Sequence, residues 1–178
     1  DKEYKGRAEG HNVFIVNPDK TAGQKWEADG KLNLVESKPK GAIFTADLTP
    51  AYVDYDIDSA LRGYKLTGNR RIFTVQDEIK TEEESEIHWL WHTEASIELH
   101  EDKKGVRLTK EGVYVDVYFK SNVDFEITSR GAVPFDTSPT VEGQLQIQGD
   151  DEVNLIDVIF ETTEDEVIFR ATTIPQGM

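Results

Sequence analysis

Apolar and polar residues alternate over short stretches of this chain, and the clearest alternation covers residues 86–93. Successive side chains of a β-strand point to opposite faces. A strand here puts two sets of side chains on opposite faces, with Ile87, Trp89 and Trp91 on one and His88, Leu90 and His92 on the other. Because two tryptophans bury a large apolar area, we expect the first face to form a core wall and the segment to be a central strand.

Similar short apolar runs recur along the chain, separated by Gly, Pro, Asn and Asp residues that favour turns. Candidate strands cover residues 11–16, 32–36, 42–46, 60–66, 70–79, 86–93, 96–100, 106–108, 113–119, 125–129, 144–148, 154–161 and 166–171. No window longer than a turn shows the 3.6-residue period of an amphipathic helix. Asp47 is expected to cap a short helical turn over residues 48–51.

This pattern predicts an all-β fold, an antiparallel β-sandwich of about ten to twelve strands in two packed sheets. The strands follow one another closely, which favours antiparallel pairing because parallel pairs need long crossover connections. The length of 178 residues is enough for one substantial domain, and we find no internal repeat or second domain within residues 1–178.

Charge and composition narrow the range of functions. The formal net charge of −15 argues against nucleic acid as a partner, because phosphate binding requires clustered Lys and Arg. No apolar run approaches the roughly 20 residues of a membrane-spanning helix. The absence of Cys excludes disulfides, thiol catalysis and cysteine metal sites. The chain shows no signal peptide and does not begin with Met, which suggests a mature or truncated protein.

The histidines are candidates for metal or acid–base chemistry. His88 and His92 have the i, i+4 spacing of helical zinc ligands, but on a strand they lie about 13 Å apart. Each zinc ligand must lie about 2 Å from the metal, so these two are expected instead to be hydrogen-bonded on the second face of their strand. His11 follows Gly10 and heads a candidate strand. It is either a strand-end histidine with a satisfied ring nitrogen or a metal ligand or acid–base group.

Catalytic motifs are absent from the sequence: there is no nucleophile elbow, phosphate loop or dinucleotide fingerprint. Carboxylates are too abundant for any pair of them to indicate catalysis, so no catalytic residue is predicted. Two aromatic residues are candidates for exposed, substrate-binding positions. Tyr52 ends a loop-like segment, and Trp26 lies in a loop where its ring is free to stack on a sugar.

Four segments, in this order, resemble a known family. They are Gly10-His11-Asn12-Val13 with the apolar run that follows, residues 46–52 (ADLTPAY), residues 70–79 (RRIFTVQDEI) and residues 88–93 (HWLWHT). Together they are similar to the C-terminal β-sandwich region of heparinase II/III-like polysaccharide lyases, a group that also includes alginate and oligoalginate lyases. The likeness covers about the first half of the chain, and the second half agrees in being rich in strands.

The resemblance implies a periplasmic or secreted parent enzyme that cleaves uronic-acid polymers by β-elimination. In such lyases an N-terminal (α/α) toroid packs against the sandwich and, with the domain junction, carries most catalytic residues. No segment of residues 1–178 has the amphipathic helices of a toroid. We therefore expect a C-terminal fragment whose partners are that toroid and an acidic polysaccharide, and which is not catalytic alone.

The resemblance also implies a zinc site in the sandwich, formed by a His, an Asp some way downstream and a further His. His11 matches the last of these, while the first two would lie upstream of Asp1. Zinc sites use three or four protein ligands, so we expect no cofactor in this fragment and zinc in the full-length parent. Two alternatives remain open: a non-catalytic carbohydrate-binding module with Trp26 and Tyr52 as its platform, and an interaction domain of a surface or secreted protein.

Overall fold

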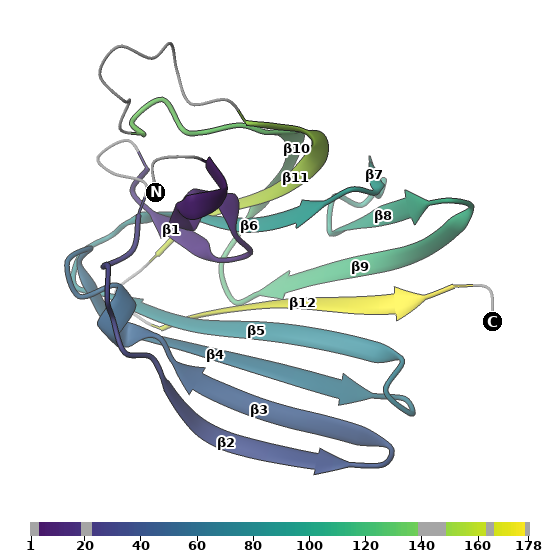
Figure 1. The fold of residues 1–178 in the computed structure, drawn as a ribbon, viewed down its shortest axis with the longest axis horizontal. Coiled ribbons are helices and arrows are strands. Elements are labelled where there is room, and N and C mark those ends of the chain that lie inside the picture. Colours follow the sequence, from purple (N-terminus) through teal and green to yellow (C-terminus); the bar gives the residue numbers. More distant parts are fainter. Residues whose placement is uncertain (1–3, 19–22, 139–148, 163–165, 177–178) are drawn as a thin grey trace.

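Two antiparallel sheets make up the protein in the computed structural model, which describes residues 4–18, 23–138, 149–162 and 166–176 (Figure 1). The smaller sheet contains β1 (Phe14–Val16), β6 (Glu86–Thr93), β11 (Asp150–Glu161) and β10 (Glu126–Ala132), in that order. The larger sheet contains β2 (Lys31–Lys38), β3 (Gly41–Asp47), β4 (Ile57–Thr67), β5 (Ile72–Thr81), β12 (Val167–Pro175), β9 (Val113–Ser121), β8 (Gly105–Lys110) and β7 (Ser96–Leu99). These twelve strands of the described residues confirm the predicted all-β sandwich.

Three short 3-10 helices, η1 (Tyr4–Gly6), η2 (Ala8–Gly10) and η3 (Thr49–Ala51), accompany the strands. The predicted helical turn is confirmed as η3, but its N-cap residue is Leu48 and not Asp47. Asp47 lies one residue earlier, where its Oδ1 accepts a hydrogen bond from the Thr49 amide at 3.0 Å. Two predicted strands began two or more residues too early. Residues 11–13 form a bend before β1, and β5 begins at Ile72 because Asn69 and Arg70 have positive φ angles of 58° and 67°. The candidate strand at 144–148 lies outside the described residues.

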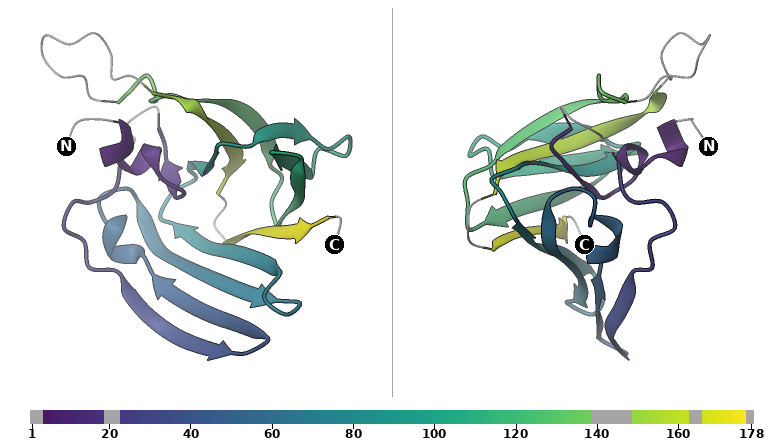
Figure 2. Two further views of the ribbon diagram at one scale, coloured as in Figure 1. Left: turned by 45° about the vertical axis from the view of Figure 1, so that its right-hand side comes forward. Right: turned by 90° about the vertical axis from the view of Figure 1, so that its left-hand side faces the viewer.

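Strand β6 lies inside the smaller sheet between β1 and β11, and it is buried on both faces. Toward the larger sheet, Trp89 packs against Phe119 and Phe169 with ring centroids 6.0 and 5.0 Å apart, and the half-buried Trp91 packs beside it. The predicted core wall is therefore confirmed. On the opposite face Leu90 joins a second, smaller core beneath the N-terminal segment, which lies on this side of the sandwich (Figure 2). Burial on both faces explains why apolar residues occur on both.

A buried ion pair within the larger sheet is the centre of a hydrogen-bond network that joins the two sheets. Arg62 on β4 and Asp77 on β5 are directly opposite each other, and their guanidinium and carboxylate groups form two hydrogen bonds of 2.6 and 2.7 Å. Across the core, Trp89 Nε1 donates to Asp77 Oδ2 at 2.7 Å. Arg62 Nη1 donates to the Asn12 carbonyl at 2.6 Å. A buried charge requires such partners, so this network fixes both sheets and the segment before β1.

Replacing Asp77 by Ala should lower the free energy of unfolding by about 3–5 kcal/mol, because Arg62 would be left as a buried charge without its carboxylate. Urea unfolding followed by tryptophan fluorescence measures the change. Glu94→Ala is the matched control, since Glu94 forms an exposed ion pair with Lys110 and such pairs contribute little. Equal midpoints for the two variants would contradict the account.

Candidate functional site

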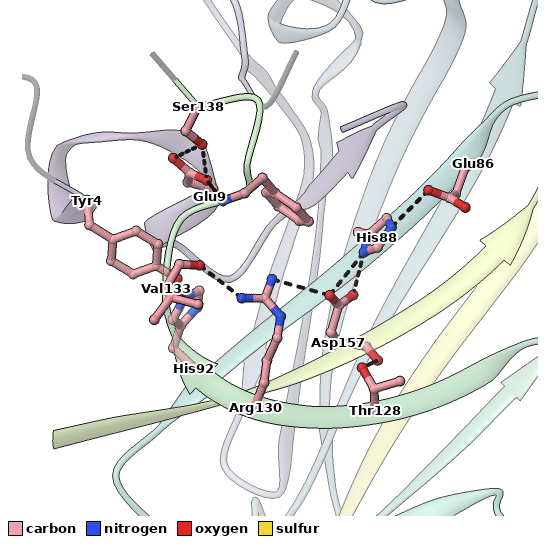
Figure 3. Close-up of polar contacts among 11 residues, drawn as sticks. Tyr4, Glu9, Glu86, His88, His92, Thr128, Arg130, Val133, Ser138 and Asp157 are labelled. Carbon is pink, nitrogen blue, oxygen red and sulfur yellow. Dashed lines mark hydrogen bonds and ion pairs between the residues drawn. The ribbon is translucent and has the colours of Figure 1, made fainter. Parts of the chain in front are cut away.

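A group of polar side chains lies on the face of the smaller sheet that points away from the larger one. We call it the outer-face cluster; its members are Tyr4, Glu9, His88, His92, Arg130 and Asp157 (Figure 3). They come from η1, η2, β6, β10 and β11, so the cluster forms only when the N-terminal segment lies against the sheet. The alternation in residues 86–93 places both histidines here, as predicted.

His88 has carboxylate partners at both of its ring nitrogens. Its Nδ1 lies 2.9 and 3.0 Å from the two carboxylate oxygens of Asp157, which stands on the neighbouring strand β11, and its Nε2 lies 3.1 Å from Glu86. Burial disfavours the charged imidazole, but the hydrogen bonds and charges of Asp157 and Glu86 outweigh burial and raise the pKa of His88. The prediction of a hydrogen-bonded histidine is confirmed.

His92 has a different environment from His88. Its Nε2 lies 2.7 Å from the Tyr4 hydroxyl, and its Nδ1 lies 3.2 Å from Asn12 Oδ1. Burial lowers the pKa of His92, and the positive charges of His11 and Arg130 lower it further. Burial also raises the pKa of Tyr4 to about 12. The Tyr4–His92 pair is therefore neutral near pH 7, and its tyrosine is a poor base.

Glu9 is a member of the cluster that sequence reasoning missed. Its carboxylate is 1% exposed and accepts hydrogen bonds from the Ser138 hydroxyl at 2.7 Å, from Arg7 at 3.0 Å and from the Phe135 amide at 2.9 Å. These contacts tie η2 to the segment after β10. The only sequence signal is a glutamate in a polar stretch, which does not distinguish it from the exposed carboxylates.

Arg130 and Asp157 complete the cluster. Arg130 Nη2 lies 3.4 Å from Asp157 Oδ2, Nη1 donates to the Val133 carbonyl at 2.9 Å, and the guanidinium stands 5.1 Å from the centre of the Phe135 ring. Asp157 thus has a histidine and an arginine as partners. The cluster is internally paired, and this arrangement is typical of a group that fastens a segment to a sheet.

His11 is exposed in the bend between η2 and β1. Both ring nitrogens of His92 already have hydrogen-bond partners, Tyr4 and Asn12. In residues 4–18, 23–138, 149–162 and 166–176, no group of three or more His, Cys, Asp or Glu side chains could hold a metal ion. These residues therefore do not fit a zinc ion by themselves, and His11 as a single ligand stays a prediction.

The two aromatic candidates differ in exposure. An exposed role for Tyr52 was wrong, because η3 turns its side chain into the core, where the ring stacks on Phe14 at 4.2 Å. The Tyr52 hydroxyl donates to the Phe14 carbonyl at 2.8 Å and accepts from Gln24 Nε2 at 2.6 Å. Trp26 is 77% exposed, so its ring is accessible, and sugar binding by it stays a prediction.

No protein-family model and no curated protein matches this sequence. Solved structures do resemble it. That of the heparinase III BT4657 gene product matches with a TM-score of 0.69 and 9% sequence identity, over 95% of this chain and 24% of that chain. The heparan sulfate lyase HepC from Pedobacter heparinus matches with a TM-score of 0.67 and 13% identity, again over 95% and 24%.

This chain has the fold of a domain of heparinase III. The resemblance seen in the four sequence segments is confirmed at the level of the fold, and the match is domain-sized because the chain spans 24% of the length of those lyase structures. A larger lyase chain contains further domains that can serve as partners. Among the described residues, no helix has the length and apolar character needed to cross a membrane.

The two histidines of β6 should titrate on opposite sides of the ordinary pKa of about 6.5. Asp157 and Glu86 keep His88 protonated to higher pH, whereas burial and nearby positive charge keep His92 neutral to lower pH. The contribution of His88 to stability is therefore present below the unfolded pKa and lost as pH rises through its folded pKa. That of His92 is present above the unfolded pKa and lost as pH falls through its folded pKa.

Nuclear magnetic resonance of the imidazole ring protons across pH measures both values. In Asp157→Asn the carboxylate charge is gone while the side-chain shape is kept, so the pKa of His88 should fall and that of His92 should stay below the ordinary value. If the pKa of His88 in the wild-type protein is equal to or lower than that of His92, the side chains of the cluster are paired differently from this description.

Proposed function

We propose that this chain is the β-sandwich module of a polysaccharide lyase that cleaves uronic-acid-containing glycans by β-elimination. In this proposal the module supports a catalytic (α/α) toroid of the same parent chain and is inactive alone. The parent is a periplasmic or secreted enzyme, and its substrate is an acidic polysaccharide. The domain-sized match to heparinase III and heparan sulfate lyase structures supports it.

One observation carries the supporting role: the larger sheet extends beyond the smaller one (Figure 1). Apolar side chains of β2 and β3 are exposed there. On the core-facing side of β2 and β3, Leu32, Val35 and Phe44 are 62%, 69% and 38% exposed. Val35 and Phe44 are directly opposite each other, as are Leu32 and Ala46. We call Leu32, Val35 and Phe44 the uncovered apolar strip.

The uncovered apolar strip continues directly into the core. Phe44 stacks on Tyr64 with centroids 4.6 Å apart, and Tyr64 stacks on Phe73 at 5.9 Å. Exposed apolar surface that is continuous with a core is typical of a docking site for another domain or protein. A parent chain about four times the length of this fold would supply such a domain, which favours a supporting module over a free-standing one.

The outer-face cluster supports the proposal that the chain is inactive alone. β-Elimination requires a base that removes the proton at C5, and an effective base has a pKa near the working pH. Tyr4 has a pKa raised to about 12, and His92 is already hydrogen-bonded through both ring nitrogens.

The proposal also assigns His11 as one ligand of a zinc site in the parent, with the other ligands outside residues 1–178.

The proposal predicts that residues 1–178 alone give no elimination product, whereas the longest reading frame that contains them does. The measurement is the absorbance of the unsaturated uronate product, with both proteins tested side by side on heparin, heparan sulfate and alginate. The reason is that the residues which remove the C5 proton lie outside this module.

Product formed by residues 1–178 would contradict inactivity and locate a complete catalytic site in this sequence. If the longer protein forms no unsaturated product from any uronic-acid polymer, the lyase proposal is wrong. Circular dichroism of residues 1–178 serves as the control that the sandwich is folded during the assay.

A non-catalytic carbohydrate-binding module is the second candidate, and the exposure of Trp26 favours it. An exposed indole presents an apolar face to a sugar ring while its N–H stays in water. Tyr52 no longer supports this candidate, because its ring lies in the core. Such a module would bind glycans with no elimination product from any length of chain.

A further inference from the structure

The side of the larger sheet that faces away from the core carries a hollow of about 550 Å³ over β3, β4, β5 and β12. We call it the outer groove; its main lining residues are Thr45, Gly63, Lys65, Gln76, Arg170 and Thr172. Its volume falls within the roughly 300–1,000 Å³ that is usual for small-molecule sites. It is separate from the outer-face cluster and from the uncovered apolar strip.

Strand register places the groove residues in two rows that run across the sheet, and each row continues onto β9, beyond the residues that line the groove. One row is formed by the directly opposite residues Thr45, Gly63, Gln76, Arg170 and Lys120. The next row is formed by Ile43, Lys65, Thr74, Thr172 and Tyr118. Residues in such a row point to the same face, so hydroxyl, amide and cationic groups line a path perpendicular to the strands.

Gly63 creates the space in the floor of the groove. A glycine inside a strand weakens it, and one common reason for its presence is the close approach of a ligand. A Cβ placed on Gly63 would have Thr45 Cγ2 as its neighbour, at an ordinary contact distance of 3.6 Å. Packing of the protein itself therefore does not require glycine here.

The polar groups of the floor are held in place by one another. Arg170 Nε donates to Gln76 Oε1 at 2.8 Å, and Gln76 Nε2 donates to Glu78 Oε1 at 2.7 Å. Two of the five N–H donors of a guanidinium point to Gln76 in this arrangement. The remaining donors of Arg170 are available to a carboxylate or sulfate, which arginine binds in a bidentate way.

Cations and one aromatic ring lie beside these groups. Lys65 and Lys120 are exposed, and neither forms an ion pair within the described part of the chain. Tyr118 is 41% exposed next to Thr172. In a protein of net charge −15, three cations on one face of a sheet are complementary to an anionic ligand.

We propose that the outer groove binds an acidic oligosaccharide, with Arg170, Lys65 and Lys120 on its carboxylate or sulfate groups and Thr45, Thr74 and Thr172 on its hydroxyls. The ring of Tyr118 stacks on a sugar at the β9 end. This inference deepens the proposed function and relies on it for the uronic acid content of the ligand. The groove holds the glycan without acting on it.

Acidic side chains limit the extent of the site. Glu78 lies at one end of the floor, and Glu98, Glu101 and Asp102 surround a second hollow of about 390 Å³ beyond Tyr118. These carboxylates repel an anionic chain. The glycan is therefore expected to run along the two rows between them, over β4, β5, β12 and β9.

Gly63→Val tests the site with little risk to folding. The branched side chain fills the floor of the groove, while valine is a better strand residue than glycine. Isothermal calorimetry with size-defined heparin and alginate oligosaccharides measures binding to residues 1–178 and to the longer reading frame. We expect at least a tenfold loss of affinity in Gly63→Val and in Lys65→Ala, with the unfolding midpoint of Gly63→Val no lower than that of wild type.

Matched controls separate the groove from general effects of charge and from Trp26. Lys110→Ala removes one positive charge from an exposed ion pair elsewhere and should leave affinity unchanged. A neutral cello-oligosaccharide should bind at least tenfold more weakly than the uronate oligomers. Trp26→Ala should retain binding.

The inference is wrong if Gly63→Val keeps wild-type affinity or if only Trp26→Ala loses binding. It is also wrong if the neutral glycan binds as tightly as the uronate oligomers, or if binding disappears in the longer chain. No binding of any probe would also overturn it. A different pair of results separates the two proposals. If the longer chain gives no elimination product but binds the oligosaccharides, and Gly63→Val abolishes that binding, the lyase proposal is wrong and the proposal of a glycan site in the groove stands.

Discussion

The Asp77 carboxylate is fully buried between the two sheets and connects three parts of the molecule. It accepts hydrogen bonds from Arg62 on the adjacent strand and from Trp89 on the opposite sheet. Through Arg62 it also holds the Asn12 carbonyl and thereby the segment that leads into β1. Since each of these groups would be costly to bury without its partner, one carboxylate constrains the stacking of the sheets and the path of the N-terminal segment.

That constraint leaves the larger sheet with two accessible surfaces of different character. The smaller sheet covers only part of its inner face, so Leu32, Val35 and Phe44 remain exposed as an apolar surface suited to another domain. The opposite face carries the polar outer groove, where Gly63 leaves space because it has no side chain. Cationic side chains lie along this groove although the protein has a net negative charge. The two proposals, a domain docked on the first surface and a glycan bound on the second, are compatible because the surfaces lie on opposite faces of one sheet.

Alternation of apolar and polar residues was enough to predict the all-β class, the core position of Trp89 and the hydrogen-bonded histidines on the other face. It failed where the answer depends on strand register or on backbone conformation. The Arg62–Asp77 pair and the outer groove bring together residues from different strands, and composition does not reveal such pairings. Tyr52 was placed on the surface because it ends a loop-like segment, whereas η3 directs its ring into the core.

We propose that this sandwich docks to another domain through the uncovered apolar strip. The measurement that checks this is amide hydrogen exchange over residues 31–47, compared between residues 1–178 and the longest reading frame that contains them. Docking would exclude water from β2 and β3 and strengthen their hydrogen bonds, so the account predicts slower exchange there in the longer protein, with strands β8 and β9 unchanged. Equal exchange of residues 31–47 in both proteins would contradict the claim.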